Sequence, residues 1–270
     1  INTYFAFSHI ANAVLSGHFF RWIGITKDLS MEQVLFTIPL TKLAIAFIPV
    51  LFVLVILACW SLPQKRTWHA LVRMLVQLLL VGYVLSYIFE SDNAWIIGSL
   101  LLVMVIFSSW IALNNIESPK KSLFNSAFWA IFISSFLVLL VITQGVLNLT
   151  PWHQAQTLVP LAGMVFANGM NSVSLCGERF FAELYRGENY LTARNIAFKA
   201  SMIPNINALF AVGIVSLPGM MTGQILAGVS PFIAARYQIM VMCMVFASAG
   251  IASAIFLIFH RENLFISKNQ

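Results

Sequence analysis

The sequence predicts an all-α, polytopic integral membrane protein with about seven transmembrane helices. Apolar residues make up 60% of the 270-residue chain and charged residues only 9%, whereas an ordinary soluble domain carries about 25% charged residues. Long runs without a charge alternate with short segments in which lysine and arginine gather. Because an open sheet leaves backbone groups unpaired in lipid, these apolar runs are expected to be helices.

The chain begins with a segment that differs from the rest, residues 1–36. It places phenylalanine and tryptophan beside histidine, arginine and lysine. This mixture predicts an amphipathic helix that lies in the outer membrane interface. A poorly ordered extension is the alternative. Residues 37–262 are then expected to form the transmembrane permease domain, and residues 263–270 a cytoplasmic tail.

The transmembrane helices follow in order, each needing about 20 mostly apolar residues. They are expected within residues 43–64, 74–89, 93–116, 122–177, 200–235 and 237–260, with two helices in the fourth range. Residues 148–153 predict the turn between those two. The range 200–235 exceeds what one crossing needs and contains Pro218-Gly219. The sixth helix is therefore predicted to be broken there, with a re-entrant or interfacial piece taking up the surplus.

The basic residues predict the orientation, because lysine and arginine concentrate on the cytoplasmic side. Seven crossings put eleven of the fifteen on one side. These are Lys65, Arg66, Arg73, Lys120, Lys121, Arg179, Arg186, Arg194, Lys199, Arg261 and Lys268. We therefore expect the amino terminus outside and the carboxyl terminus in the cytoplasm.

A charged, amphipathic stretch between the fifth and sixth helices is the first candidate site. Its apolar stripe and charged side are formed by Glu178, Arg179, Phe180, Phe181, Glu183, Leu184, Tyr185 and Arg186. Gly187 is a plausible end for this helix, and a second helix is expected from near Asn189 to Lys199. The stretch is either a solvated loop helix or a coupling helix that fills a cleft on a cytoplasmic ATPase.

The chain has no nucleotide site of its own. The phosphate-binding pattern G-x-x-x-x-G-K-[ST] does not occur, and no glycine is followed directly by lysine. If ATP drives this protein, a partner subunit binds the ATP and magnesium. The chain itself is expected to be neither an enzyme nor a cofactor-binding protein.

The second candidate site is a translocation path at the break, where Pro218 removes a backbone donor and Gly219 and Gly223 loosen the helix. Broken helices often line substrate sites in transporters, although a kink can simply shape the bundle. The candidates are Gln77, Asn168, Asn171, Pro218, Gly219, Met220, Met221 and Gln224. The amides could also join helices. The methionines could bind a soft metal or fill gaps, and no metal-ligand set is predicted.

Small residues recur four apart in the fifth and seventh helices. The pairs are Gly163 with Ala167, Ser248 with Ala252, Ala249 with Ser253 and Gly250 with Ala254. This spacing lets helices approach closely. It is compatible both with packing inside one subunit and with a dimer face.

Three stretches carry a resemblance to a known family: 75–85 (LVQLLLVGYVL), 159–164 (VPLAGM) and 212–223 (VGIVSLPGMMTG), the last continued by Ala227-Gly228 and by 237–240. Over roughly residues 43–260 the chain resembles the FetB-like permeases of bacterial ABC transporters, which are implicated in iron export and have plant relatives linked to aluminium tolerance. The resemblance implies a bacterial inner-membrane protein, a separate ATPase subunit and a permease homodimer.

The chain departs from the family in two places. Residues 1–36 are longer than the family's start, and residues 178–199 look shorter than the corresponding region of the iron-export member. The leading hypothesis is a permease subunit that exports in iron or metal homeostasis by alternating access. An ATP-independent channel or carrier, or a membrane regulatory subunit that transports nothing, are the alternatives. The lack of an acidic residue firmly within the bilayer argues against a proton-coupled carrier.

Overall fold

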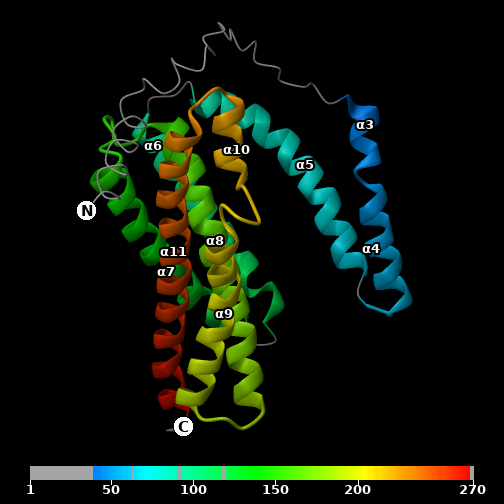
Figure 1. Cartoon of the computed structure of the whole chain (residues 1–270). Coiled ribbons are helices and arrows are strands. Elements are labelled where there is room, and N and C mark those ends of the chain that lie inside the picture. The colour runs from blue at the N-terminus through cyan, green and yellow to red at the C-terminus, as the bar shows by residue number, and fades with distance from the viewer. Residues whose placement is uncertain (1–38, 63, 90–92, 117–119, 268–270) are drawn as a thin grey trace, which may run out of the picture.

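The computed structural model describes residues 39–62, 64–89, 93–116 and 120–267, and within them it contains helices and the turns that join them (Figure 1). The segment 1–36, predicted to be interfacial, lies outside the described residues. Five described segments are long and apolar enough to cross a membrane. They are Lys42–Cys59, Ala94–Ala112, Leu123–Val146, Ala155–Tyr185 and Pro231–His260. The prediction of a polytopic, all-α membrane protein is confirmed.

The elements follow one another with short connections. In chain order they are α3 (Leu40–Ile45), α4 (Ile48–Cys59), α5 (Gln64–Phe89), α6 (Ala94–Ala112), η1 (Leu113–Asn115), α7 (Lys120–Leu140), η2 (Val141–Val146), α8 (Ala155–Tyr185), α9 (Tyr190–Ala211), α10 (Gly219–Leu226) and α11 (Pro231–Ser267). The turn predicted at 148–153 lies between η2 and α8 as expected. α11 runs on through much of the stretch predicted to be a tail.

The second and sixth predicted crossings are not among these five segments. α5 has 26 residues but carries Lys65, Arg66 and Arg73 in its first half. The sixth consists of α9, the segment 212–218 and α10. In Figure 1 these three pieces climb from the end of the bundle where α11 finishes, here called the C-end, to the opposite end where α11 starts. The surplus residues predicted in this crossing therefore form the segment 212–218 and a separate helix.

The break is wider than Pro218-Gly219 and begins as soon as α9 ends at Ala211. Gly213 has φ +83°, a left-handed conformation that a residue with a Cβ adopts at a cost. The amides of Gly213 and Val215 donate to Ser216 O (2.9 Å) and Ala211 O (2.8 Å). A tight turn thus pairs these backbone groups before α10 begins.

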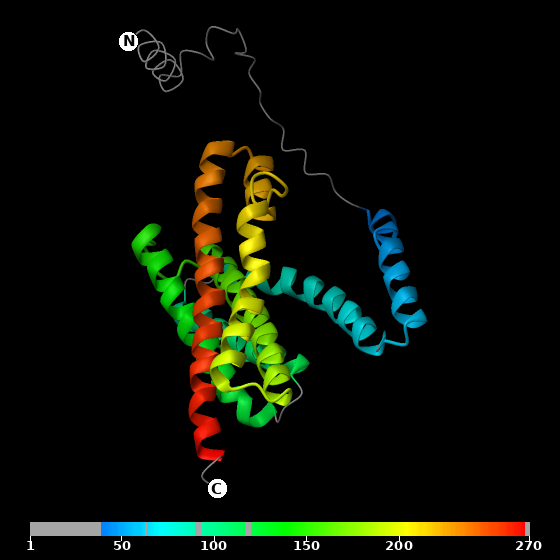
Figure 2. The ribbon, with the colours of Figure 1, turned by 60° about the horizontal axis from the view of Figure 1, so that its bottom comes forward.

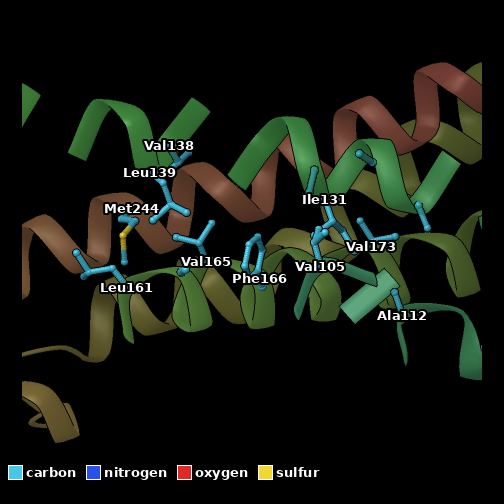
Figure 3. Packing of buried hydrophobic residues seen from close by; sticks show 14 of the residues in the cluster. Val105, Ala112, Ile131, Val138, Leu139, Leu161, Val165, Phe166, Val173 and Met244 are labelled. Carbon is cyan, nitrogen blue, oxygen red and sulfur yellow. The ribbon is translucent and has the colours of Figure 1, made fainter. Parts of the chain in front are cut away.

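Four helices enclose the main core. Side chains of α6, α7, α8 and α11 interdigitate there (Figure 3), among them Val105, Ile131, Val165 and Met244. Phe124, Phe128, Phe132 and Phe136 stack along α7, each centroid about one helical turn from the next (5.9–6.3 Å). Apolar residues surround most of these helices, as expected for a bundle whose outer surface faces lipid.

The small residues of α11 pack inside the chain. Ser248, Ala249, Ala252 and Ser253 are each fully buried. A Cβ placed on Gly169 of α8 would lie 3.7 Å from Ala252 Cβ, so α8 and α11 approach backbone to backbone. Of the two interpretations of this spacing, the structure supports packing within one subunit for these residues.

α4 and α5 lean away from the bundle in both Figure 1 and Figure 2. No residue of α4 is buried. Among the side chains of α5 that the structure describes, those in the core belong to its last turns, where Leu85, Ile88 and Phe89 pack against it. This pair of helices therefore presents most of its side chains outward.

Candidate functional site

A cavity of about 410 Å³ lies beside α10 at the end opposite the C-end. The first turns of α8, one side of α10 and the first turns of α11 surround it. Its walls are Leu147, Gln156, Thr157, Pro160, Leu161, Met220, Gln224, Val229, Ile233, Tyr237 and Met240. The break places it there, because α10 can turn one side toward α8 and α11 only after the chain leaves α9.

Polar groups without a helical or side-chain partner gather at this cavity. Gln224 Oε1 is buried and accepts no hydrogen bond within the described structure. Pro160 lies inside α8 and has no N–H, so the carbonyl of Gln156 lacks its usual helical donor. A buried acceptor without a partner is costly unless water or a ligand meets it. The cavity therefore offers the Gln224 amide oxygen to whatever enters.

Soft ligands complete the wall. Met220 and Met240 contribute thioethers, which are polarizable and bind weakly. Among the residues whose side chains are described, no three of histidine, cysteine, aspartate and glutamate come together. The cavity can therefore hold a weakly solvated ion or a neutral complex through amide, hydroxyl and thioether contacts. Such contacts permit release as well as binding.

The structure brings together only part of the predicted path. Met220 and Gln224 line the cavity. Pro218 is the residue before α10 and Gly219 its first residue. Met221 lies on the same helix but is not part of the wall. Sequence reasoning missed four polar or sulfur-bearing lining residues: Gln156, Thr157, Tyr237 and Met240. Pro160, a proline inside an apolar run, was the available signal for the first two.

The three remaining candidates do not line this cavity. The expectation that Gln77 lies near the break was wrong, while a pathway role for Asn168 and Asn171 stays a prediction. Gln77 is exposed at the middle of α5, which leans away from the bundle. With its amide oriented to accept, its oxygen lies 3.0 Å from Arg73 Nε. Asn168 donates to Met164 O (2.8 Å) within α8, about 12 Å along the helix from Pro160. Asn171 is exposed. The sequence pattern of one chain does not show which helices, distant along the chain, pack together. The residues that line a cavity between such helices could therefore not be predicted.

The predicted coupling stretch is not a separate helix, which corrects a second expectation. α8 runs unbroken from Ala155 to Tyr185. At 31 residues it is longer than a bilayer requires, by about ten residues. Glu178, Arg179 and the residues after them therefore form the projecting end of a transmembrane helix, because nothing in that sequence interrupts the helical hydrogen bonds.

Phe180 faces the protein rather than a partner. Its side chain is fully buried. Its ring lies 5.4 Å from Phe181, 5.9 Å from Tyr190 and 6.0 Å from His260, measured between centroids. The apolar stripe thus holds α8, α9 and α11 together at the C-end. Phe181 and Leu184 are half-buried in the same contact.

Glu183 has a structural partner on each side. It is buried, and its Oε1 lies 2.7 Å from Arg179 Nη2 and 2.9 Å from Arg186 Nη1. Both pairs join residues of the last α8 turns. Burial of a single carboxylate is tolerable here because two guanidinium groups donate to it. Glu178 and Arg186 are exposed.

The turn between α8 and α9 is built as the sequence predicted. Gly187 has φ +91°, and the Glu188 amide donates to Glu183 O (3.1 Å), which ends α8. Asn189 Oδ1 accepts from the Thr192 amide (2.9 Å), which starts α9. The turn exposes large side chains at the tip of the molecule: Tyr185 is 72% exposed and Leu191 59% exposed.

Comparison with known proteins shows which family the sequence matches. The sequence profile of the Uncharacterised protein family (UPF0014) matches residues 40–265. The "Probable iron export permease protein FetB" of Escherichia coli is 34% identical over 226 residues, covering 77% of this chain and 84% of that protein. The "UPF0014 membrane protein YjkA" of Bacillus subtilis is 34% identical over 225 residues, covering 77% and 87%.

A plant relative is more distant. "Protein ALUMINUM SENSITIVE 3" of Arabidopsis thaliana is 25% identical over 250 residues, covering 86% of this chain and 89% of that protein. No solved structure matches the chain. The family profile covers nearly all of the described helices, from α3 to the last turns of α11. This chain belongs to the UPF0014 family of membrane proteins.

Proposed function

We propose that this chain is the membrane permease subunit of an ABC transporter that exports in iron or metal homeostasis. The observation that carries the proposal is that one helix has a cavity at one end and an exposed turn at the other. α8 contributes Gln156, Thr157 and Pro160 to the cavity. Its other end forms the exposed turn at the C-end. The name of the Escherichia coli relative, a "Probable iron export permease", supports the cargo and direction.

The proposed assembly has a separate cytoplasmic ATPase, which binds ATP and magnesium and docks at the C-end. The positive charge near that end supports its assignment to the cytoplasm of a bacterial inner membrane. Because Phe180 is buried, the docking surface is the turn itself, formed by Tyr185, Arg186, Glu188 and Leu191. Exposed aromatic and aliphatic anchors with a charged rim suit such an interface.

Closure of the ATPases would move this turn, and α8 would carry the movement to the cavity. The Met220 and Met240 thioethers and the Gln224 amide would contact the cargo only briefly. In this mechanism the chain supplies binding and movement, and it performs no chemistry on the cargo.

The test is ATPase association. Leu191→Asp puts a charge into the exposed turn without touching the buried contacts of Phe180. Loss of one central apolar anchor is expected to weaken association at least about tenfold. Leu226→Asp is the matched control, because Leu226 is 74% exposed at the opposite end. Association is measured as the ATPase that co-purifies with the permease from membranes.

Equal recovery of ATPase with Leu191→Asp and with the unaltered chain would contradict docking at this turn. If no ATPase accompanies even the unaltered chain while purified protein still moves metal across vesicles, an ATP-independent carrier replaces the proposal. If ATPase binds but vesicles move nothing, a regulatory subunit does.

A further inference from the structure

A second cavity, of about 480 Å³, lies between α9 and α11 near the C-end. The proposed function does not use it. Its walls are Arg194, Asn195, Phe198, Lys199, Ala254, Leu257 and Ile258. Two cations therefore stand at the rim of a pocket whose wall is otherwise mostly apolar. This combination suits a ligand with an anionic head and an apolar body.

The two cations differ from their neighbours in having no carboxylate partner. Within the described residues Glu183 binds Arg179 and Arg186, while no ion pair involves Arg194 or Lys199. Arg194 donates from Nε and Nη2 to Asn195 Oδ1, at 3.1 Å and 2.9 Å. These bonds orient the guanidinium and leave Nη1 for a ligand. A guanidinium fork matches the geometry of phosphate oxygens.

The positions along α9 suit the boundary between lipid headgroups and acyl chains. Arg194 lies about 6 Å and Lys199 about 14 Å from Tyr190, where α9 begins. A lysine at that depth can bury its stem and extend its ammonium to the headgroups. The first turn of α9 also carries the positive end of the helix dipole. Beyond the cations, Ala254, Leu257 and Ile258 continue the apolar wall along α11.

We propose that this pocket binds an anionic phospholipid of the leaflet at the C-end, with its phosphate on Arg194 and Lys199 and an acyl chain along α11. A free phosphate would share the cationic rim but would gain nothing from the apolar wall. A second copy is a poorer occupant. A two-fold contact at this groove would set two cations of one protomer near the same two of the other. The inference does not depend on the proposed function.

The test measures lipid bound to the purified full-length chain by native mass spectrometry. Phosphatidylglycerol and phosphatidylcholine are titrated separately into delipidated protein. Since each cation near an anionic membrane surface contributes about fivefold to binding, Arg194→Gln with Lys199→Gln should weaken phosphatidylglycerol binding about 25-fold. Phosphatidylcholine binding should change little. Lys42→Gln with Arg236→Gln is the control, because it removes two charges from outside the pocket.

Two further variants separate the head from the chain. Ala254→Phe fills the apolar wall without changing charge and should also weaken phosphatidylglycerol binding several-fold. Arg194→Lys with Lys199→Arg keeps both charges and should retain binding within a few-fold, which shows that loss in the glutamine variant is not misfolding. Elution volume and melting temperature of every variant are compared with those of the unaltered chain.

Three outcomes would overturn the proposal. The first is equal phosphatidylglycerol binding by the glutamine pair and by the unaltered chain. The second is displacement of the lipid by millimolar inorganic phosphate together with no effect of Ala254→Phe, which would make the pocket a soluble-anion site. The third is a crosslink between cysteines placed at Asn195 of two copies, which would show that a second chain covers the groove.

Discussion

Phe180 is the residue whose environment most changes the interpretation of the C-end. In the sequence it belongs to an apolar stripe beside charges, which is equally typical of a docking face and of a packing face. The structure buries it against Tyr190 and His260, so it holds three helices together. The Tyr190 hydroxyl, which donates to Leu257 O (2.9 Å), supports the same junction between α9 and α11.

Replacing Phe180 by alanine should therefore destabilise the fold. Loss of a fully buried phenylalanine costs about 3 kcal/mol or more, since the cavity left behind collapses only in part. The measurement is the midpoint of thermal unfolding in detergent. Phe210→Ala makes the same chemical change at a residue that is 77% exposed and should move the midpoint little. Equal shifts for the two variants would show that Phe180 is not a packing residue.

Local rules predicted the ends of helices well at this scale. Gly187 and Asn189 have conformations and bonds that depend on only a few neighbouring residues. The burial of Phe180 was not predictable in the same way. It depends on His260, which is distant along the chain and approaches only when α8 and α11 pack together.

The broken crossing is the element on which the candidate site depends. Its existence followed from Pro218-Gly219 inside a long apolar run, and the apolar runs likewise predicted the other crossings. Its width did not follow, because α9 ends at Ala211 through a turn held by Gly213. The cavity wall was predicted only where it comes from α10. The α8 and α11 contributions arise from packing between distant segments.

Cysteine labelling tests whether this element borders a water-filled path. After the native Cys59, Cys176 and Cys243 are replaced, single cysteines at Met220 and Met240 should react with a water-soluble thiol reagent. Ile239→Cys is the matched control, because Ile239 is next to Met240 but 65% exposed outside the cavity. Reaction at the cavity positions is expected to be several-fold faster.

In alternating access, a cavity on the path is open to water in one state of the transporter and closed in the other. The labelling is therefore repeated with ATP and the partner ATPase present. If neither Met220→Cys nor Met240→Cys reacts in either condition, the cavity is closed to water and the path assignment fails.

At the scale of the whole molecule, α4 and α5 are the helices that pack least against the rest of the fold. α5 places the exposed Gln77 near its middle. An amide at that depth is poorly accommodated by hydrocarbon and is better met by another protein surface. The sequence could not show this, since a helix packed within its own chain and one packed on a second chain have similar apolar patterns.

We expect the purified permease to be a homodimer in which α5 contributes to the contact. Its mass in mild detergent should correspond to two chains. Gln77→Leu should weaken the dimer about threefold for each amide hydrogen bond lost. Leu79→Ala, at a 77% exposed position two residues away, provides a comparison on the same helix. A single-chain mass in the presence of bound ATPase would contradict the dimer.

The length of α8 has a mechanical consequence. Its 31 residues, Ala155–Tyr185, form one continuous helical rod of about 46 Å, with Pro160 close to one tip and the C-end turn at the other. Buried residues occur along the whole rod, from Ala155 to Glu183, so a tilt would carry both of its ends. If it pivots around Gly169, where a Cβ would lie 3.7 Å from Ala252 Cβ of α11, a tilt of about 5° would displace its two tips in opposite directions by about 2 Å each. The C-end turn and the α8 wall of the cavity would then move together, because both belong to the same helix.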